Sequence, residues 1–178
     1  MMCIVGEPTS MQVVIGHKGK LSYKCIVRGL EAHSSLAPQG VNAVEYAAEL
    51  IAYLKGMARQ IQKDGPFDDV YDITHTTVHT GTVHGGTALN IVPKDCSFEF
   101  EFRCIAGHDG HELFEKVKRH AHEVLEPEMK AIDQSAGFKF EELSAIEGLD
   151  IDRGEEVVLS AAQRPRVDHD ARRDDLHD

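Results

Sequence analysis

The chain has 178 residues, of which 42% are hydrophobic, and a formal net charge of -11 at pH 7. This length and composition predict one ordinary domain with a real core, plus appendages. The negative charge argues against a nucleic-acid or anionic-membrane partner, because both are negatively charged and bind to a basic protein surface. Apolar stretches are far shorter than the roughly 20 residues that a membrane-spanning helix needs.

The cysteines favour a reducing compartment. Cys3, Cys25, Cys96 and Cys104 form no Cys-x-x-Cys pair, and the last three fall on the apolar side of strand patterns. We interpret them as small buried hydrophobes rather than as a disulfide framework. The sequence therefore favours a cytoplasmic protein.

The first half of the chain predicts a strand and a long helix. Residues 19–29 alternate between apolar and polar side chains, as in a half-buried strand. Asn42, with Glu45 three residues later, begins a helix as in a capping box, and the helix runs to about Ile61.

This helix carries two apolar stripes, and one of them should lie on the sheet. The second stripe lies roughly 120° around the helix and consists of Tyr46, Leu50, Tyr53 and Met57. Tyrosines suit a surface that is apolar with a polar handle. We therefore favour a self-association face over a helix sunk in its own core.

The second half predicts two strands, a helix and a last strand. Residues 71–83 have the composition of a strand but alternate poorly, which suits an edge strand. Residues 96–104 alternate most clearly. Asp109 with Glu112 caps a helix that keeps its period up to Pro127. Residues 138–143 form the last short strand.

This order of elements predicts an α+β fold. Strand, helix, strand, strand, helix and strand are the signature of the ferredoxin-like βαββαβ two-layer sandwich, in which two helices cover one face of a four-stranded antiparallel sheet. In that arrangement the second strand lies at an edge. Two copies could join their sheets there.

Few residues are candidates for chemistry. Eleven histidines suggest a metal, but His75 and His79 are expected on one strand face without a carboxylate, and no strong ligand spacing is present. No nucleophile elbow or phosphate loop is present either.

Four residues remain: Glu7, His33, Asn90 and Arg103. Each taken singly suits a structural role, as a turn or loop residue or a solvated strand arginine. Together, a carboxylate, an imidazole, an amide and a guanidinium could ligate a metal, polarise a carbonyl and clamp a carboxylate.

Several motifs occur in one order along residues 3 to about 150. They are Gly6-Glu7-Pro8-Thr9, His17-Lys18-Gly19, Gly29-x-x-x-His33-Ser34-Ser35, Gly40-Val41-Asn42-Ala43, Gly85-Gly86-x-Ala88-x-Asn90-Ile91-Val92-Pro93 and Phe102-Arg103. The set resembles the zinc-dependent hydrolase family of acetylornithine deacetylase, succinyl-diaminopimelate desuccinylase, aminoacylase and glutamate carboxypeptidase, with acetylornithine deacetylase as the most similar branch.

The resemblance implies a lid and dimerisation domain, inserted in a catalytic domain that holds two zinc ions. Glu7 would ligate one zinc. His33 would reach into the site of the partner subunit in a homodimer and stabilise the tetrahedral oxyanion. Asn90, with Gly86, would hold the substrate, and Arg103 would pair with its carboxylate.

The resemblance also predicts how the chain divides. Residues 1–15 would end the catalytic domain, 16–145 would form the lid, and 146–163 would return to the catalytic domain. Residues 164–178 are almost wholly arginine, aspartate and histidine, which predicts a disordered or non-native tail. A zinc site needs three or four protein ligands, so we expect no stably bound zinc and no activity from the chain by itself.

The expected reaction is removal of the acyl group from a small N-acylated amino acid, in the first place N-acetylornithine in arginine biosynthesis. Desuccinylase or aminoacylase activity stays open, because the residues that measure the acyl group are not identified. A stand-alone ferredoxin-like module that pairs through its edge strand and binds a small ligand is the alternative from a different class.

Overall fold

The computed structural model describes residues 12–162 and 168–173. Its centre is a four-stranded antiparallel sheet in the order β4-β6-β2-β7. The strands are β2 (Gly19–Arg28), β4 (Thr77–Gly85), β6 (Asp95–Cys104) and β7 (Gly137–Ile146). The predicted ferredoxin-like sandwich is confirmed, and β4 lies at an edge of the sheet.

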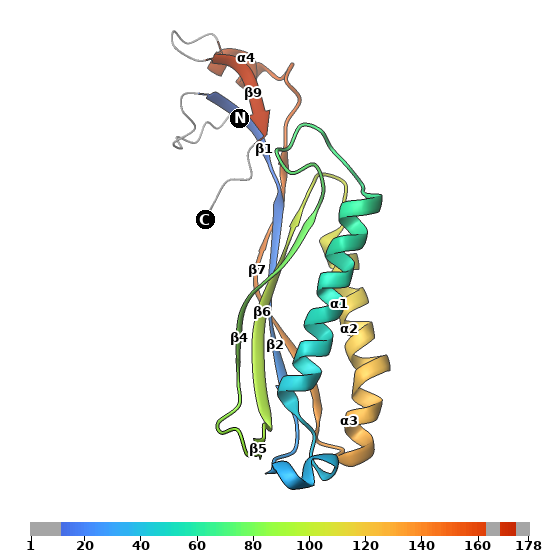
Figure 1. Cartoon of the computed structure of the whole chain (residues 1–178). Coiled ribbons are helices and arrows are strands. Elements are labelled where there is room, and N and C mark those ends of the chain that lie inside the picture. The colour runs from blue at the N-terminus through green and yellow to red at the C-terminus, as the bar shows by residue number, and fades with distance from the viewer. Residues whose placement is uncertain (1–11, 163–167, 174–178) are drawn as a thin grey trace.

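Two helical segments cover one face of this sheet (Figure 1). The first is α1 (Ala43–Asp64). The second is continuous and consists of α2 (Gly110–Arg119), the π-helix η2 (His120–Leu125) and α3 (Glu126–Ile132). The sequence predicted that this helix ends near Pro127, which is wrong. Pro127 lies just after the π-helix η2, so its missing N–H falls where the hydrogen-bond pattern changes from π to α and the helix can continue.

Both long helices begin at the predicted caps. The side chain of Asn42 accepts hydrogen bonds from the backbone N–H groups of Val44 and Glu45, at 3.0 and 3.2 Å. Asp109 does the same for the N–H groups of His111 and Glu112. These side chains satisfy N–H groups that have no partner inside a helix, and they fix where each helix starts.

The core lies between the sheet and the helices. Alternate side chains of β2 and β6 face the helices and are buried; they are Leu21, Tyr23, Cys25 and Val27, and Cys96, Phe98, Phe100, Phe102 and Cys104. The ring of Tyr23 stacks on Phe114 with 3.7 Å between centroids. Cys25, Cys96 and Cys104 are buried free thiols, as predicted, whereas Cys3 lies outside the described residues.

The second stripe of α1 has partners within the chain. Leu50 is fully buried in the core, so it offers no surface to a second copy. The ring of Tyr53 stacks on His120 of η2, with 3.9 Å between centroids, and Tyr46 and Met57 are half-buried against the same core. The prediction that Leu50 belongs to a self-association face is wrong, because its side chain is fully buried in its own chain. Tyr46, Tyr53 and Met57 stay partly exposed, and their place in such a face stays a prediction.

The chain enters and leaves the sandwich at one end. Before β2, β1 (Gln12–His17) pairs antiparallel with β8 (Leu149–Asp150), which follows β7. A Cβ atom on Gly19 would lie 3.1 Å from the backbone N of Gly148, so the two connections run in close contact. We call this the linker end; α4 (Glu156–Ala162) also contacts β1.

Part of the predicted disordered tail forms a strand. β9 (Asp168–Arg173) pairs parallel with β1 in an irregular register. Strand pairing satisfies backbone groups without an apolar core. The assignment of residues 164–178 to a disordered or non-native tail stays a prediction. Residues 163–167 and 174–178 lie outside the described residues. Within the described part, no helix is long and apolar enough to cross a membrane.

Candidate functional site at the distal end

Two loops meet at the end of the sandwich opposite the linkers, which we call the distal end (Figure 1). β3 (Ala32–His33) pairs antiparallel with β5 (Ile91–Val92), and His33 stands opposite Ile91. The backbone N–H of Ser34 donates a hydrogen bond of 3.0 Å to the carbonyl of Asn90. The structure therefore brings the two loops that carry His33 and Asn90 together.

Backbone contacts fix the base of both loops. The N–H of Gly29 donates to the carbonyl of Lys94 at 2.7 Å, and the N–H of Ala43 donates to Pro93 at 2.8 Å. A Cβ atom on Gly29 would lie 2.0 Å from the carbonyl oxygen of Val41, a distance that no real Cβ contact allows. A side chain at this glycine would separate the two ends of the loop that carries His33.

The ring of His33 is held as a hydrogen-bond donor. Its Nδ1 accepts the backbone N–H of Ser35 at 3.2 Å and lies 2.8 Å from the hydroxyl of Ser35, so the ring caps the short 3-10 helix η1 (Ser34–Gln39). Because Nδ1 is an acceptor, the neutral imidazole carries its proton on Nε2. His33 is exposed, and Nε2 makes no hydrogen bond within the described part of the chain.

The loop from Gly86 to Asn90 projects into solvent. All residues from 81 to 90 are exposed, and Leu89 is 102% exposed. Gly86 has a φ of 82°, which favours glycine, and the N–H of Ile91 closes the turn on the carbonyl of Ala88 at 3.2 Å. The turn places Asn90 beside the His33 loop.

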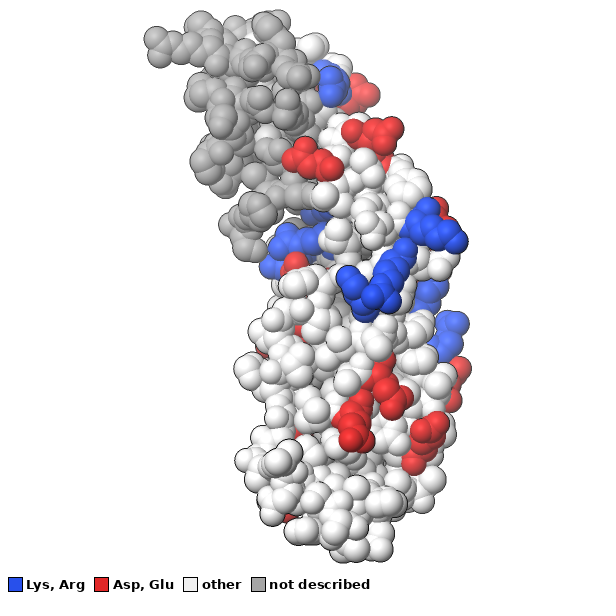
Figure 2. All heavy atoms as spheres, in the orientation of Figure 1, with Lys and Arg blue, Asp and Glu red and all other residues white. Residues whose placement is uncertain are grey.

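The two loops at the distal end carry no charge at their tips. Residues 32–44 and 81–93 contain no Lys, Arg, Asp or Glu, whereas Arg28 and Asp95 form an exposed ion pair of 3.0 Å at the base of the loops. Figure 2 shows this lower end of the molecule almost entirely white, whereas charged side chains of both signs lie over the helices. An uncharged surface loses less hydration free energy when it is buried. The distal end is therefore suited to insertion into another protein surface.

Arg103 does not join this site within one chain. It stands near the linker end of β6, opposite Lys20 of β2 and Thr77 of β4, on the face away from the helices, which we call the open face. Its Nε donates to Glu101 at 3.1 Å. Eight residues of extended strand separate it from Asp95 at the distal end, or about 26 Å at the usual rise per residue.

The described residues supply no complete set of metal ligands. Glu7, the predicted zinc ligand, lies outside them. Within the described part, no group of three or more His, Cys, Asp or Glu side chains could hold a metal ion. These residues do not fit the two-zinc centre that the resemblance implies.

Sequence reasoning missed a clamp at the linker end. Lys18 is only 4% exposed, although lysine is rarely buried. Its Nζ donates to the carbonyl of His75 at 3.0 Å and lies 5.6 Å from the centre of the Tyr71 ring. Lys18 thereby ties the segment before β4 to the entry of β2. The motif His17-Lys18-Gly19 was the available signal.

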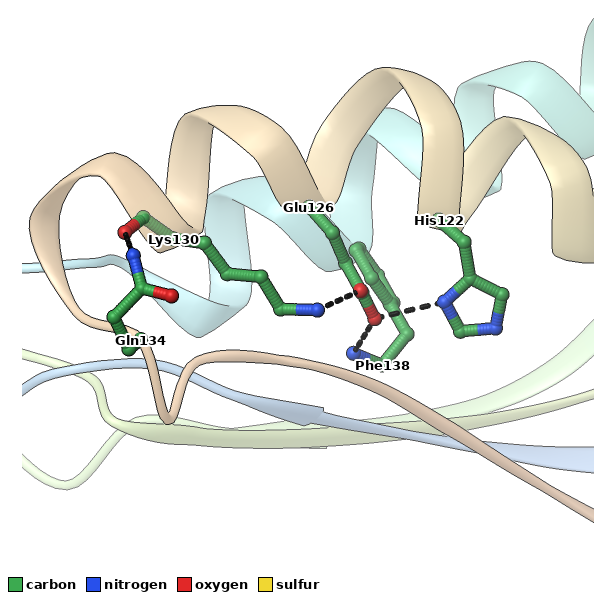
Figure 3. Close-up of polar contacts among 5 residues, drawn as sticks. All are labelled: His122, Glu126, Lys130, Gln134 and Phe138. Carbon is green, nitrogen blue, oxygen red and sulfur yellow. Dashed lines mark hydrogen bonds and ion pairs between the residues drawn. The ribbon is translucent and has the colours of Figure 1, made fainter.

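A second missed feature is a buried carboxylate at the junction of η2 and α3 (Figure 3). Glu126 accepts the backbone N–H of Phe138 at 2.9 Å and contacts Nδ1 of His122 at 2.8 Å, and Lys130 also donates to it. Burial pushes the pKa of Glu126 up, but these hydrogen bonds outweigh it and lower the pKa. Glu126 therefore anchors the helices to the start of β7.

Known proteins match this chain over the sandwich. Residues 15–129 match the family model described as "Peptidase dimerisation domain" (M20_dimer). Acetylornithine deacetylase from Pectobacterium carotovorum is 35% identical over 104 residues, which cover 58% of this chain and 27% of that protein. The enzyme of that name from Edwardsiella ictaluri is 33% identical over 117 residues, which cover 66% and 30%. The chain thus spans under a third of these curated relatives.

Solved structures agree on the fold. A tripeptidase from Staphylococcus aureus superposes with a TM-score of 0.66 at 24% identity, over 92% of this chain and 40% of that one. Aminopeptidase PepT from Bacillus cereus gives 0.67 at 22% identity, over 94% and 41%. Because the family model covers well over half of the sequence, the chain belongs to the peptidase dimerisation domain family of M20 hydrolases.

Proposed function

We propose that this domain is the lid of a zinc-dependent hydrolase that removes the acyl group from N-acylated amino acids, with N-acetylornithine as the preferred substrate, in arginine biosynthesis. The curated relatives named acetylornithine deacetylase support this substrate. The zinc ions and most of their ligands belong to other parts of a longer enzyme, and Glu7 contributes one ligand there. The isolated chain is inactive.

The single observation that carries the proposal is the orientation of His33, whose Nδ1 accepts from Ser35 while its Nε2 makes no hydrogen bond within the described part of the chain, on a loop tip without charged residues. In amide hydrolysis, negative charge develops on the carbonyl oxygen as the tetrahedral intermediate forms. A donor that is already oriented stabilises this charge without reorganisation. Ser35 fixes the tautomer and the orientation of the ring, so His33 is the oxyanion donor.

Asn90 and Gly86 hold the substrate beside His33, and Arg103 binds its carboxylate. Within one chain, Arg103 lies about 26 Å along β6 from the distal end. This distance is longer than a small amino acid. A single active site therefore takes His33 and Asn90 from one copy and Arg103 from the other. The enzyme must act as a homodimer in which each lid reaches the site of its partner.

The open edge of β4 is the surface for this pairing. Within the described residues, β4 pairs with β6 on one side and with no strand on the other. An exposed strand edge presents unpaired N–H and C=O groups that a second strand can satisfy. Joining two such edges extends the sheet across the dimer and leaves both distal ends free.

A lid exchange tests the proposal. Residues 17–149 replace the matching segment of the Pectobacterium carotovorum acetylornithine deacetylase, and the exchanged enzyme is assayed on N-acetylornithine, N-succinyl-diaminopimelate and other N-acyl amino acids. We expect activity on N-acetylornithine above the others, and none from the 178-residue chain with added zinc. A folded, dimeric exchange enzyme without activity contradicts the proposal, as does turnover by the isolated chain.

A further inference from the structure

The open edge of β4 carries two histidines on one face. His79 stands opposite Glu101 of β6, and His84 stands opposite Ser97. Gly81, between Thr80 and Thr82, has no partner on β6 and forms a bulge. Because of this extra residue, His79 and His84 point to the same face although they are five residues apart. Both imidazoles are exposed and lie on the open face of the sheet.

One copy cannot bind a metal through these two rings. Four strand steps, after the bulge is left out, place them about 13 Å apart. A metal ion bound by imidazoles lies about 2.0–2.1 Å from each nitrogen, so both rings cannot reach one ion. This agrees with the absence of a three-ligand group in the described part of the chain.

A second copy changes this geometry. When two β4 edges pair antiparallel about a twofold axis, residues directly opposite each other lie on the same face of the joined sheet. Two registers place residues of the same face opposite each other and pair most of the length of β4. Their twofold axis passes through Thr82 or through Thr80. In the register centred on Thr82, His79 lies directly opposite His84 of the partner copy. In the register centred on Thr80, these two residues are diagonal neighbours.

We propose that each pair of β4 edges binds divalent transition-metal ions between His79 of one copy and His84 of the other. This inference rests on the homodimer of the proposed function. Directly opposed residues on paired strands have Cβ atoms about 4.5–5.5 Å apart, which lets two imidazoles share one ion. The ion belongs to the class that prefers imidazole, such as Zn²⁺, Ni²⁺ and Cu²⁺, and water completes its coordination.

The neighbouring strand supplies the second layer of such a site. Glu101 lies next to His79 on the open face, and its carboxylate already accepts hydrogen bonds from Arg103 at 3.1 Å and from Ser22 at 3.5 Å. It can also accept the N–H of the imidazole nitrogen that does not bind the metal, which orients the ring. The twofold axis repeats the arrangement, so one dimer holds two such ions.

Sedimentation of the full 178-residue chain tests this site. The chain is first stripped of metal, and its dimer dissociation constant is measured with and without ZnCl₂, NiCl₂ or CuCl₂. Metal that binds only the dimer tightens association by a factor of 1 + [metal]/Kd at each site, so a tenfold excess over Kd tightens it about tenfold per site. EDTA should reverse the effect.

Variants assign the response to the two rings. His79→Asn and His84→Asn should each remove the metal response and leave the metal-free dimer unchanged. His111→Asn, at an exposed histidine on α2, should keep the full response. A mixture of the His79→Asn and His84→Asn chains should recover part of it, because each mixed dimer restores one intact pair.

The outcomes separate this site from the proposed function. A chain that stays monomeric with and without metal contradicts the homodimer, and the metal site with it. A metal-free dimer that does not respond to the three ions contradicts only the metal site. So does a response that the His79→Asn and His84→Asn variants both retain.

Discussion

The backbone N–H of Ser34 donates a hydrogen bond of 3.0 Å to the carbonyl of Asn90. His33, the residue before Ser34, pairs with Ile91 between the two short strands β3 and β5. The same backbone contacts therefore hold residues His33 and Asn90 next to each other. Changes that separate the two loops should affect both residues together.

The first prediction concerns Gly40, where the loop that carries His33 packs against β5. A Cβ atom there would lie 2.9 Å from the carbonyl oxygen of Leu30 and 3.1 Å from Val92. We expect Gly40→Ala to lower the free energy of unfolding by about 1–3 kcal/mol, measured by urea denaturation of the chain.

Gly56→Ala is the matched control for this change. Gly56 is exposed in the middle of α1, and a Cβ atom there meets nothing within 4 Å. We expect it to raise the free energy of unfolding by about 0.5–1 kcal/mol, because alanine favours the helix. Equal effects of the two substitutions would show that Gly40 is not a point of close approach.

The second prediction concerns the second stripe of α1. Leu50 is fully buried, so Leu50→Ala should cost about 2–5 kcal/mol of stability through the cavity it leaves. The molar mass measured by light scattering should not change at concentrations where the chain stays folded. A stable, monomeric Leu50→Ala variant of a dimeric parent would restore the interface interpretation.

The third prediction concerns Glu126 and pH. The pKa of Glu126 is lowered in the folded chain, so its contribution to stability is present above the unfolded value of 4.5 and is lost as pH falls below it. At pH 7, Glu126→Gln should cost about 1–3 kcal/mol. The difference between parent and variant in urea should shrink towards pH 3.

Glu141→Gln controls for a simple charge effect, because the Lys139–Glu141 pair of 2.7 Å is exposed. We expect no measurable change in stability from it, since exposed ion pairs contribute little. A cost for Glu126→Gln that stays constant from pH 7 to pH 3 would rule out the charged carboxylate as its source.

The fourth prediction concerns the buried thiols. Burial, with a smaller effect of Asp109, raises the pKa of Cys104 to about 11, and burial also raises the pKa of Cys25 and of Cys96. In a Cys3→Ser variant, these thiols should react slowly with a thiol-specific reagent at pH 8 and at once in urea. Immediate reaction of the folded variant would show that the cysteines are accessible.

The strands and caps were largely predictable from the sequence. β6 alternates strictly between Cys96 and Cys104, and Asn42 and Asp109 cap their helices through local contacts. β4 was placed too early, at residues 71–83, and His75 is not part of this strand. The reason is physical: Tyr71 is buried by its contact with Lys18, and the bulge at Gly81 breaks the alternation.

The candidate site was predictable only in part. Motif resemblance selected His33 and Asn90, and the structure joins their loops. Alternation could not show that Arg103 lies at the other end of β6, because strand direction and register decide this. The in-chain partner of the α1 stripe was also hidden, since helical periodicity identifies an apolar face but not what covers it.

The central claim, that one site takes His33 and Arg103 from different copies, is tested most directly by complementation in the lid-exchanged enzyme. His33→Ala and Arg103→Ala should each lower turnover about a hundredfold or more. Mixing the two inactive enzymes and letting subunits exchange should restore about a quarter of the parent activity, since half of the dimers are mixed and each has one complete site. No recovery, with subunit exchange shown by sedimentation of labelled chains, would contradict the claim.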